Sequence, residues 1–163
     1  MEQSKLNEIL EKHKHWINED CDGWREMKAN LRGANLREVN LYGADLYGAN
    51  NIPFIPYACP DFGMFIGFKK ARNNLIVVLE IPEDAKRLSA TGRKCRCDKA
   101  RVLEIQNLDG TKSDKTEAVS QYDKDFIYRV GEIVSVPDFC EDRWNECSKG
   151  IHFFINRQEA VDY

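Results

Sequence analysis

The chain has 163 residues, of which 42% are hydrophobic and 31% charged, and its formal net charge is −3. This length fits one domain of common size or a smaller domain with an appendage, and the composition favours a packed globule over disorder. The slightly acidic balance gives no support for nucleic-acid binding. No apolar run approaches the roughly eighteen residues of a transmembrane helix. Six cysteines without a secretory leader predict reduced thiols in a cytoplasmic protein.

An amphipathic helix is expected over residues 3–18, within a first segment spanning residues 1–23. Ser4 is a candidate N-cap, and Asp20-Cys21-Asp22-Gly23 is the expected exit turn. His13 and His15 are expected at the surface or its boundary and not as ligands. The side chains that share the apolar face at helical spacing are Leu6, Ile9, Leu10, His13, Trp16 and Ile17.

The next segment, residues 24–51, has a period of five. A small apolar residue, then Asn or Asp, then Leu recurs four times and begins a fifth. The steps are Ala29-Asn30-Leu31, Ala34-Asn35-Leu36, Val39-Asn40-Leu41, Ala44-Asp45-Leu46 and Ala49-Asn50. This period matches neither a helix nor an ordinary strand, and self-similarity at a fixed period is typical of a solenoid. The tract resembles the pentapeptide-repeat family, whose chain winds into a right-handed quadrilateral β-solenoid with four repeats per coil.

That resemblance implies a short solenoid of about one coil. The residues implied to point inward are Leu31, Leu36, Leu41 and Leu46, with Ala29, Ala34, Val39 and Ala44 beside them. The residues implied to point outward are Arg32, Arg37, Tyr42 and Tyr47. One coil buries little area, so it must pack on the helix, on the rest of the chain or on a second subunit, and the helix is the expected cap. Exposed Tyr42 and Tyr47 favour a homo-oligomer. Outward arginines on so short a coil do not fit the acidic DNA mimicry of long family members, so no specific DNA binding is expected.

Prolines at three positions predict an extended connector over residues 52–61, with Phe54, Ile55 and Tyr57 packed across the repeats. Residues 62–163 then predict a small β-rich α+β domain, which makes the whole chain mainly β. Strands are expected over residues 65–69, 75–81, 101–105, 126–130, 133–136 and 151–155, with turns at 71–74 and 108–110. Residues 111–125 are expected to form an exposed loop. Asn156 is expected to cap a short helical turn that runs to residue 163.

Three motifs stand out in the C-terminal domain: Leu79-Glu80-Ile81-Pro82-Glu83-Asp84-Ala85, Tyr128-Arg129-Val130-Gly131-Glu132 and Arg143-Trp144-Asn145-Glu146-Cys147. In these motifs the domain resembles a domain of unassigned function that often follows pentapeptide repeats in phage and prophage proteins. This resemblance implies a protein of phage or mobile-element origin that acts in the bacterial cytoplasm. The genomic company of the family suggests a role against a host defence that signals through nucleotides. It implies no mechanism.

The segment Lys86–Lys94 combines hydroxyls, a glycine and cations in an expected loop between strands, an inventory that binds oxyanions. It lacks the spacing of a P-loop. Phe65, Phe68 and Trp144 offer a stacking surface for a base. The expected ligand-binding residues are Lys69, Arg87, Ser89, Thr91, Arg93, Lys94, Arg143, Trp144 and His152. The interpretation is a non-enzymatic protein that sequesters a small anionic, nucleotide-like ligand such as a cyclic nucleotide, without a cofactor.

Three alternatives stay open. The basic run of residues 86–101 and the acidic run of residues 132–146 could simply meet and pair on one surface. Cys147, His152 and Glu146 could serve an enzyme that acts on a nucleotide or a peptide. The chain could also be a protein–protein interaction module. A zinc site made of Cys95, Cys97, Cys147 and His152 is disfavoured, because the Cys-x-x-Cys spacing is missing and bases surround it, so no metal is expected.

Overall fold

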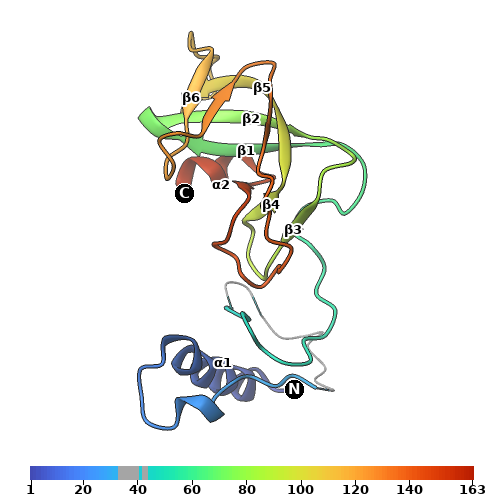
Figure 1. The fold of residues 1–163 in the computed structure, drawn as a ribbon, viewed down its shortest axis with the longest axis vertical. Helices are drawn as coiled ribbons and strands as arrows, with labels where there is room; N and C mark the ends of the chain where they lie inside the picture. Colours follow the sequence, from blue (N-terminus) through green and yellow to red (C-terminus); the bar gives the residue numbers. More distant parts are fainter. Residues whose placement is uncertain (33–40, 42–43) are drawn as a thin grey trace.

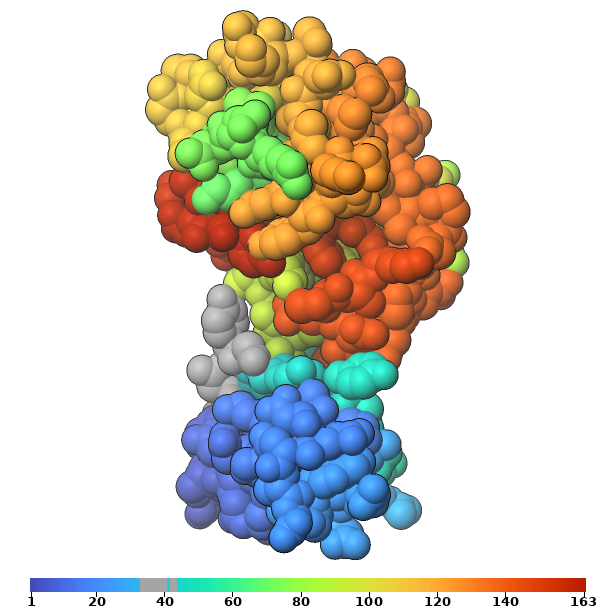
Figure 2. Space-filling model, turned by 60° about the vertical axis from the view of Figure 1, so that its left-hand side comes forward, coloured from blue at the N-terminus to red at the C-terminus, as the bar shows by residue number. Residues whose placement is uncertain are grey.

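The computed structural model describes residues 1–32, 41 and 44–163 (Figure 1). Its architecture is mainly β with an N-terminal helix. Helix α1 and the described repeat residues lie at one end of an elongated molecule, and a β-rich domain lies at the other (Figures 1 and 2). None of the helices in the described part of the chain is long and apolar enough to cross a membrane.

Helix α1 spans Gln3–Asn18, as the apolar spacing predicts, and a short 3-10 turn, η1, follows at Trp24–Glu26. The expected cap is wrong, because Glu2 is the N-cap residue and Ser4 lies inside the first turn, with no side-chain capping bond. The expectation for His13 is also wrong. Its ring is fully buried, stacks on Trp16 with 5.3 Å between ring centroids, and its Nδ1 accepts a hydrogen bond from the backbone N–H of Ala29 at 3.3 Å.

The described repeat residues support the expected inward positions. Leu31 and Leu46 are buried with Leu6 of α1, and Leu41 packs beside them. Arg32 and Tyr47 are exposed. The other predicted positions in the repeats, Ala34, Leu36, Arg37, Val39 and Tyr42, lie outside the described residues. A parallel bridge joins Asn30 to Asn50, with Leu31 N–H donating to Asn50 O at 2.9 Å. In the described residues this bridge does not extend into a closed sheet.

The C-terminal domain contains three sheets. The first has the order β1-β2-β5-β8, the second β3-β4-β9, and the third pairs β6 with β7, all antiparallel. The strands are β1 (Phe65–Ala71), β2 (Leu75–Ile81), β3 (Arg87–Ser89), β4 (Cys95–Cys97), β5 (Lys99–Asn107), β6 (Glu117–Val119), β7 (Ile127–Arg129), β8 (Ile133–Ser135) and β9 (Ile151–Phe153). The 3-10 turn η2 (Arg72–Asn74) and helix α2 (Arg157–Asp162) complete the domain.

All six expected strands are present, and Asn156 caps α2 by accepting a hydrogen bond from Gln158 N–H. Asn73 and Asn74 adopt left-handed conformations (φ 59° and 56°) that join β1 to β2, which suits the expected hairpin turn. Two loop expectations are wrong, because β3 lies within residues 86–94 and β6 within residues 111–125. Both segments are mostly polar and lack the runs of β-branched and aromatic residues that indicate a strand.

The core of this domain lies between the four-stranded sheet and β9. Val77, Leu79 and Ile105 from the sheet pack with Ile151 and Phe153 from β9, all buried. Gly67 in β1 makes this close approach sterically feasible, because a Cβ there would lie 2.6 Å from Cδ2 of Phe153. The packing therefore fixes β9 across the face of β1.

The outer edge of β1 pairs with two different segments in turn. Phe68 exchanges two backbone hydrogen bonds of 2.8 Å with Phe154, and Ala71 bridges to Ser120. Lys69 lies on β1 between these two bridges. The segment after β9 and the β6–β7 hairpin therefore pair with β1 on either side of Lys69.

Arg143 ties the C-terminal domain to the connector. Its guanidinium donates to the carbonyls of Ile55 and Ser89 at 2.7 Å each and of Ala90 at 3.1 Å. Trp144 beside it packs against the cluster of Leu6, Leu31 and Leu46. In Figure 2 the orange-red segment that carries these residues lies against the teal connector.

The expected packing of the connector is only partly confirmed. Ile55 packs on the N-terminal cluster, whereas Phe54 is 91% exposed and Tyr57 is also exposed. Arg143 lies over the ring of Tyr57, 4.4 Å from its centroid, so this aromatic side chain packs on an arginine and not on the repeats.

Candidate functional site

A cavity of about 480 Å³ opens in the C-terminal domain beside the edge of β1. Its walls come from β1, from the β6–β7 hairpin, from the end of β8 and from the start of β9. The lining residues are Lys69, Ser120, Tyr122, Asp123, Phe126, Tyr128, Ser135, Val136, Pro137, Asp138, Lys149, Gly150, Ile151 and His152. Ligand sites in proteins have volumes in this range.

Lys69 is the buried cation of this cavity. Lys69 shares the inner face of β1 with Gly67 and Ala71, and only 9% of the residue is exposed. Within the described residues, its ammonium has no hydrogen-bond or ion-pair partner. Burial is the main cause that lowers the pKa of Lys69 from its ordinary 10.5 to about 8, and nearby Lys94 lowers it further. A buried lysine is rarely left unpaired, so this ammonium offers an unused positive charge to the cavity.

His152 lines the same cavity and is half-buried. Its Nε2 lies 3.1 Å from the carbonyl oxygen of Ser148, which can only accept, so Nε2 donates and Nδ1 carries no proton. Burial, with repulsion from Lys69 and Lys94, lowers the pKa of His152 to about 3. The imidazole is therefore neutral at physiological pH and contributes a polar group without charge.

Aromatic rings and hydroxyls form another part of the lining. The ring centroids of Phe126 and Tyr128 lie 5.2 Å apart, and Tyr122, which also lines the cavity, is 71% exposed. Burial raises the pKa of the Tyr128 phenol, which keeps its proton. Asp138 at the rim forms an ion pair with Lys149, so its charge is compensated. The arrangement can hold a flat group against the rings and an oxyanion at Lys69.

The predicted loop site is not assembled as expected. Arg87 is buried in β3 and donates to the carbonyls of Ala85, Gly63, Pro82 and Glu83 at 2.5 to 3.0 Å. These guanidinium bonds hold the chain before β1 and the turn after β2. Arg87 is thus a structural residue, because its donors are used by the protein backbone.

Four other predicted binding residues are likewise used within the fold. Ser89 Oγ accepts a hydrogen bond from Ala58 N–H at 2.8 Å, and Thr91 Oγ1 donates to Ala44 O at 2.6 Å. Arg143 and its neighbour Trp144 contact the connector and the N-terminal cluster. These side chains join the two ends of the molecule and lie away from the cavity lining.

The three remaining cations of the segment have protein partners of their own. Arg93 Nε lies 2.8 Å from Glu159 Oε1, which is outside the acidic run of residues 132–146. Lys94 Nζ lies 3.7 Å from Cys147 Sγ and over the ring of Tyr163. The expected meeting of the basic and acidic runs is confirmed at one pair, because Lys86 contacts Glu141.

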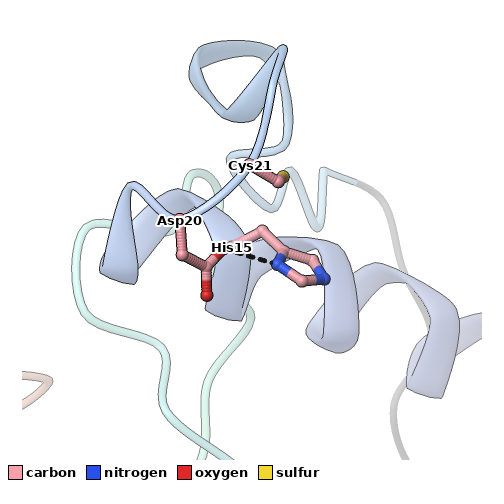
Figure 3. A group of neighbouring side chains, drawn as sticks. All are labelled: His15, Asp20 and Cys21. Carbon is pink, nitrogen blue, oxygen red and sulfur yellow. Dashed lines mark hydrogen bonds and ion pairs between the residues drawn. The ribbon is translucent and has the colours of Figure 1, made fainter.

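The alternative catalytic set is not brought into contact. Cys147 is exposed and contacts Lys94, whereas His152 donates to Ser148 O. Among the residues that the structure describes, Cys95, Cys97, Cys147 and His152 do not gather at one point. The group of potential ligands that does gather is His15, Asp20 and Cys21 (Figure 3).

Comparison with protein-family models identifies both parts of the chain. The model for "Family of unknown function (DUF5758)" matches residues 55–160, and the model for "Pentapeptide repeats (8 copies)" matches residues 28–50. The chain therefore belongs to the DUF5758 family, with pentapeptide repeats N-terminal to that domain. Comparisons with curated proteins and with solved structures gave no match.

Sequence reasoning placed Lys69 and His152 in the site, and the structure brings both to one cavity. It missed the aromatic wall, because Tyr122 lies in the segment expected to be an exposed loop. The alternation of Gly67, Lys69 and Ala71 with bulkier neighbours was the available signal, since it places the lysine among small residues on the inner face of a strand.

Proposed function

We propose that the C-terminal domain binds a small anionic ligand in the cavity beside β1, with Lys69 as its counter-charge. The observation that carries this proposal is a lysine that is nine-tenths buried, lines a cavity and has no partner among the described residues. Desolvating a cation without compensation is costly, and an oxyanion at Lys69 would remove that cost.

The remaining lining favours a ligand that is nucleotide-like. Phe126 and Tyr128 supply rings for stacking, and Ser120 and Ser135 supply hydroxyls at the wall. A single buried ammonium suits one negative charge, because each further charge would need a cation of its own. The other lining cation, Lys149, is already paired with Asp138. A phosphodiester such as a cyclic nucleotide carries one negative charge and fits this balance better than a triphosphate.

Binding without chemical conversion is the form of this function that we favour. Cys147 and His152 show no hydrogen bond to each other in the described structure, and a neutral histidine with a strongly lowered pKa is a poor base. Sequestration of a signalling nucleotide in the cytoplasm of a bacterial host, against a host defence, is the biological role that we propose. The free cysteines and the resemblance to phage proteins support that setting.

We also propose that the repeats form about one right-handed quadrilateral coil capped by α1. The bridge between Asn30 and Asn50 joins residues twenty positions apart, which is the length of four five-residue steps. Leu6 of the helix packs on Leu31 and Leu46, as a cap would. Exposed Tyr47 supports self-association of this coil into a homo-oligomer.

The binding proposal is tested by thermal denaturation with inorganic phosphate, nucleoside monophosphates and cyclic mono- and dinucleotides. A ligand that binds only the native state stabilises by about 2.7 kcal/mol at one hundred times Kd, which should raise Tm by roughly 5 °C or more for this size. Lys69→Met should abolish the shift. Lys70→Met is the matched control, because Lys70 carries the same charge on the neighbouring position and bonds Val161 O instead.

The outcomes separate the possibilities. A shift in the wild type and in Lys70→Met, but not in Lys69→Met, supports the proposal. An equal shift in all three proteins, or none with any compound, contradicts it. Ligand recovered after heat denaturation should be chemically unchanged, whereas a converted compound would favour the enzymatic alternative.

A further inference from the structure

A second cluster of chemically active side chains lies at the other end of the molecule, where α1 ends. His15 is in the last turn of the helix, and Glu19 follows in a left-handed conformation (φ 54°) that reverses the chain. Asp20 and Cys21 therefore lie beside the imidazole, as Figure 3 shows. His15 Nδ1 lies 2.6 Å from Asp20 Oδ1, and one donor atom from each of the three residues lies within 4.8 Å of the others.

We propose that His15, Asp20 and Cys21 bind a divalent transition metal ion of the zinc type. Imidazole nitrogen, carboxylate oxygen and thiolate sulfur are the three donor types that zinc takes, at bond lengths of about 2.0–2.3 Å. Donors around a tetrahedral zinc are then roughly 3.3–3.8 Å apart. The metal ion would replace the hydrogen bond between His15 Nδ1 and Asp20 Oδ1, and the side chains would rotate to this spacing, for which the partial exposure of all three residues leaves room.

Two neighbouring features suit such a site. Met27 Sδ lies 3.8 Å from Cys21 Sγ, which places a second soft donor next to the thiol. A hollow of about 370 Å³ lined by residues 19–25 leaves room for water at the remaining coordination position. Three protein ligands with one open position resemble accessible zinc sites more than closed structural ones.

Metal binding at His15, Asp20 and Cys21 requires each ligand atom to be free of its proton. The thiol of Cys21 must lose its proton to bind as thiolate, and that proton goes to solvent. The neutral imidazole binds through a ring nitrogen that carries no proton, and Asp20 binds as carboxylate. Metal binding would fasten the exit turn to α1, whose buried residues Leu6 and His13 pack on the repeats.

Cobalt(II) is the probe for this site, because a cobalt–thiolate bond gives an absorption band in the near ultraviolet. One equivalent added to the metal-free full chain should produce that band, and zinc should remove it. Cys21→Ser should abolish it, and His15→Ala should weaken cobalt binding by about tenfold or more. Cys147→Ser is the matched control, because Cys147 is the exposed cysteine of the C-terminal domain and should leave the band intact.

A second readout keeps the proposal testable if a variant is unstable. Zinc should protect Cys21 from alkylation by iodoacetamide in the wild type, as measured by mass spectrometry of its peptide. His15→Ala keeps the cysteine but should lose that protection. No cobalt–thiolate band in the wild type, a band that survives Cys21→Ser, or equal alkylation with and without zinc would overturn the proposal.

Discussion

The two ends of this molecule are stabilised differently. The N-terminal end packs one helix on the repeats through Leu6, Leu31 and Leu46, the fully buried apolar cluster among its described residues. The C-terminal domain has a four-stranded sheet and a continuous core that includes Leu79, Ile105 and Phe153. The end with the clear sequence repeat thus has the smaller buried core. We infer that its stability depends on the contacts it makes with the rest of the chain.

The largest expected effect is in the C-terminal core. Phe153→Ala removes a fully buried ring that packs against Gly67, and it should lower the free energy of unfolding by about 3–5 kcal/mol. Urea denaturation followed by circular dichroism measures this loss. Leu46→Ala is the matched change in the cluster of Leu6, Leu31 and Leu46. It should lower the free energy of global unfolding by less than Phe153→Ala does. An equal loss from both variants would contradict the difference between the two ends.

The next effect concerns Lys69 and alkaline pH. The folded pKa of about 8 lies below the unfolded value of 10.5, so the unfolded chain binds more protons between these values. Stability should therefore rise with pH across this window through Lys69, by about 3 kcal/mol in total. The free energy of unfolding should be measured for the wild type and for Lys69→Met at pH 7.5 and 9.5. The value for the wild type minus that for Lys69→Met should be larger at pH 9.5. A difference that stays constant with pH would contradict it, and exposed Lys124→Met is the control.

A smaller effect is expected where the two ends meet. Arg143→Met removes three hydrogen bonds to carbonyls of the connector and of the β3 end, and should cost about 2 kcal/mol. Limited proteolysis should then cut the connector faster, while the sheet core stays resistant. Arg129→Met, an exposed arginine of β7, is the control. Unchanged cleavage in Arg143→Met would show that the connector is held by other contacts.

The smallest effect is acid loosening of the N-terminal end. Burial lowers the pKa of His13 below its ordinary 6.5, so stability from its neutral ring is present at neutral pH and is lost as pH falls below that value. The pKa of His152 in the C-terminal domain is also lowered, so its contribution to stability is likewise lost as pH falls. Hydrogen exchange at pH 7 and 5.5, corrected for intrinsic rates, should show loosening of α1 that His13→Gln removes and His152→Asn does not. Loosening that persists in His13→Gln would contradict this assignment.

Long, regular patterns made much of the fold predictable from sequence. The apolar spacing of α1 and the β-branched runs around Asn73 and Asn74 each specify an element through local chemistry. The strands β3, β4 and β6 were missed because they lack the runs of β-branched and aromatic residues that indicated β7, β8 and β9, which are equally short. His13 lay on the apolar face of its helix, but its burial depends on the repeats that pack there.

The site was less predictable because sequence does not reveal the partner of a charged side chain. Arg87 and Arg143 look like anion ligands, yet both donate to backbone carbonyls: Arg87 mainly to the turn after β2 and also to Gly63, and Arg143 to the distant connector. Lys69 differs from them only through its surroundings, since β9 and the β6–β7 hairpin diverge at its position on β1. His15, Asp20 and Cys21 meet because one left-handed residue reverses the chain.

The most direct test of the proposed binding site follows the protonation of Lys69 itself. Nuclear magnetic resonance of the lysine ε-methylene groups, with Lys69→Met to assign the signal, gives its titration midpoint with and without the compound that raises Tm most. A midpoint near 8 in the free protein that moves upward on binding is the predicted result, because an oxyanion stabilises the ammonium form. A midpoint near 10.5 in the free protein, or one that the bound compound leaves unchanged, would contradict the account.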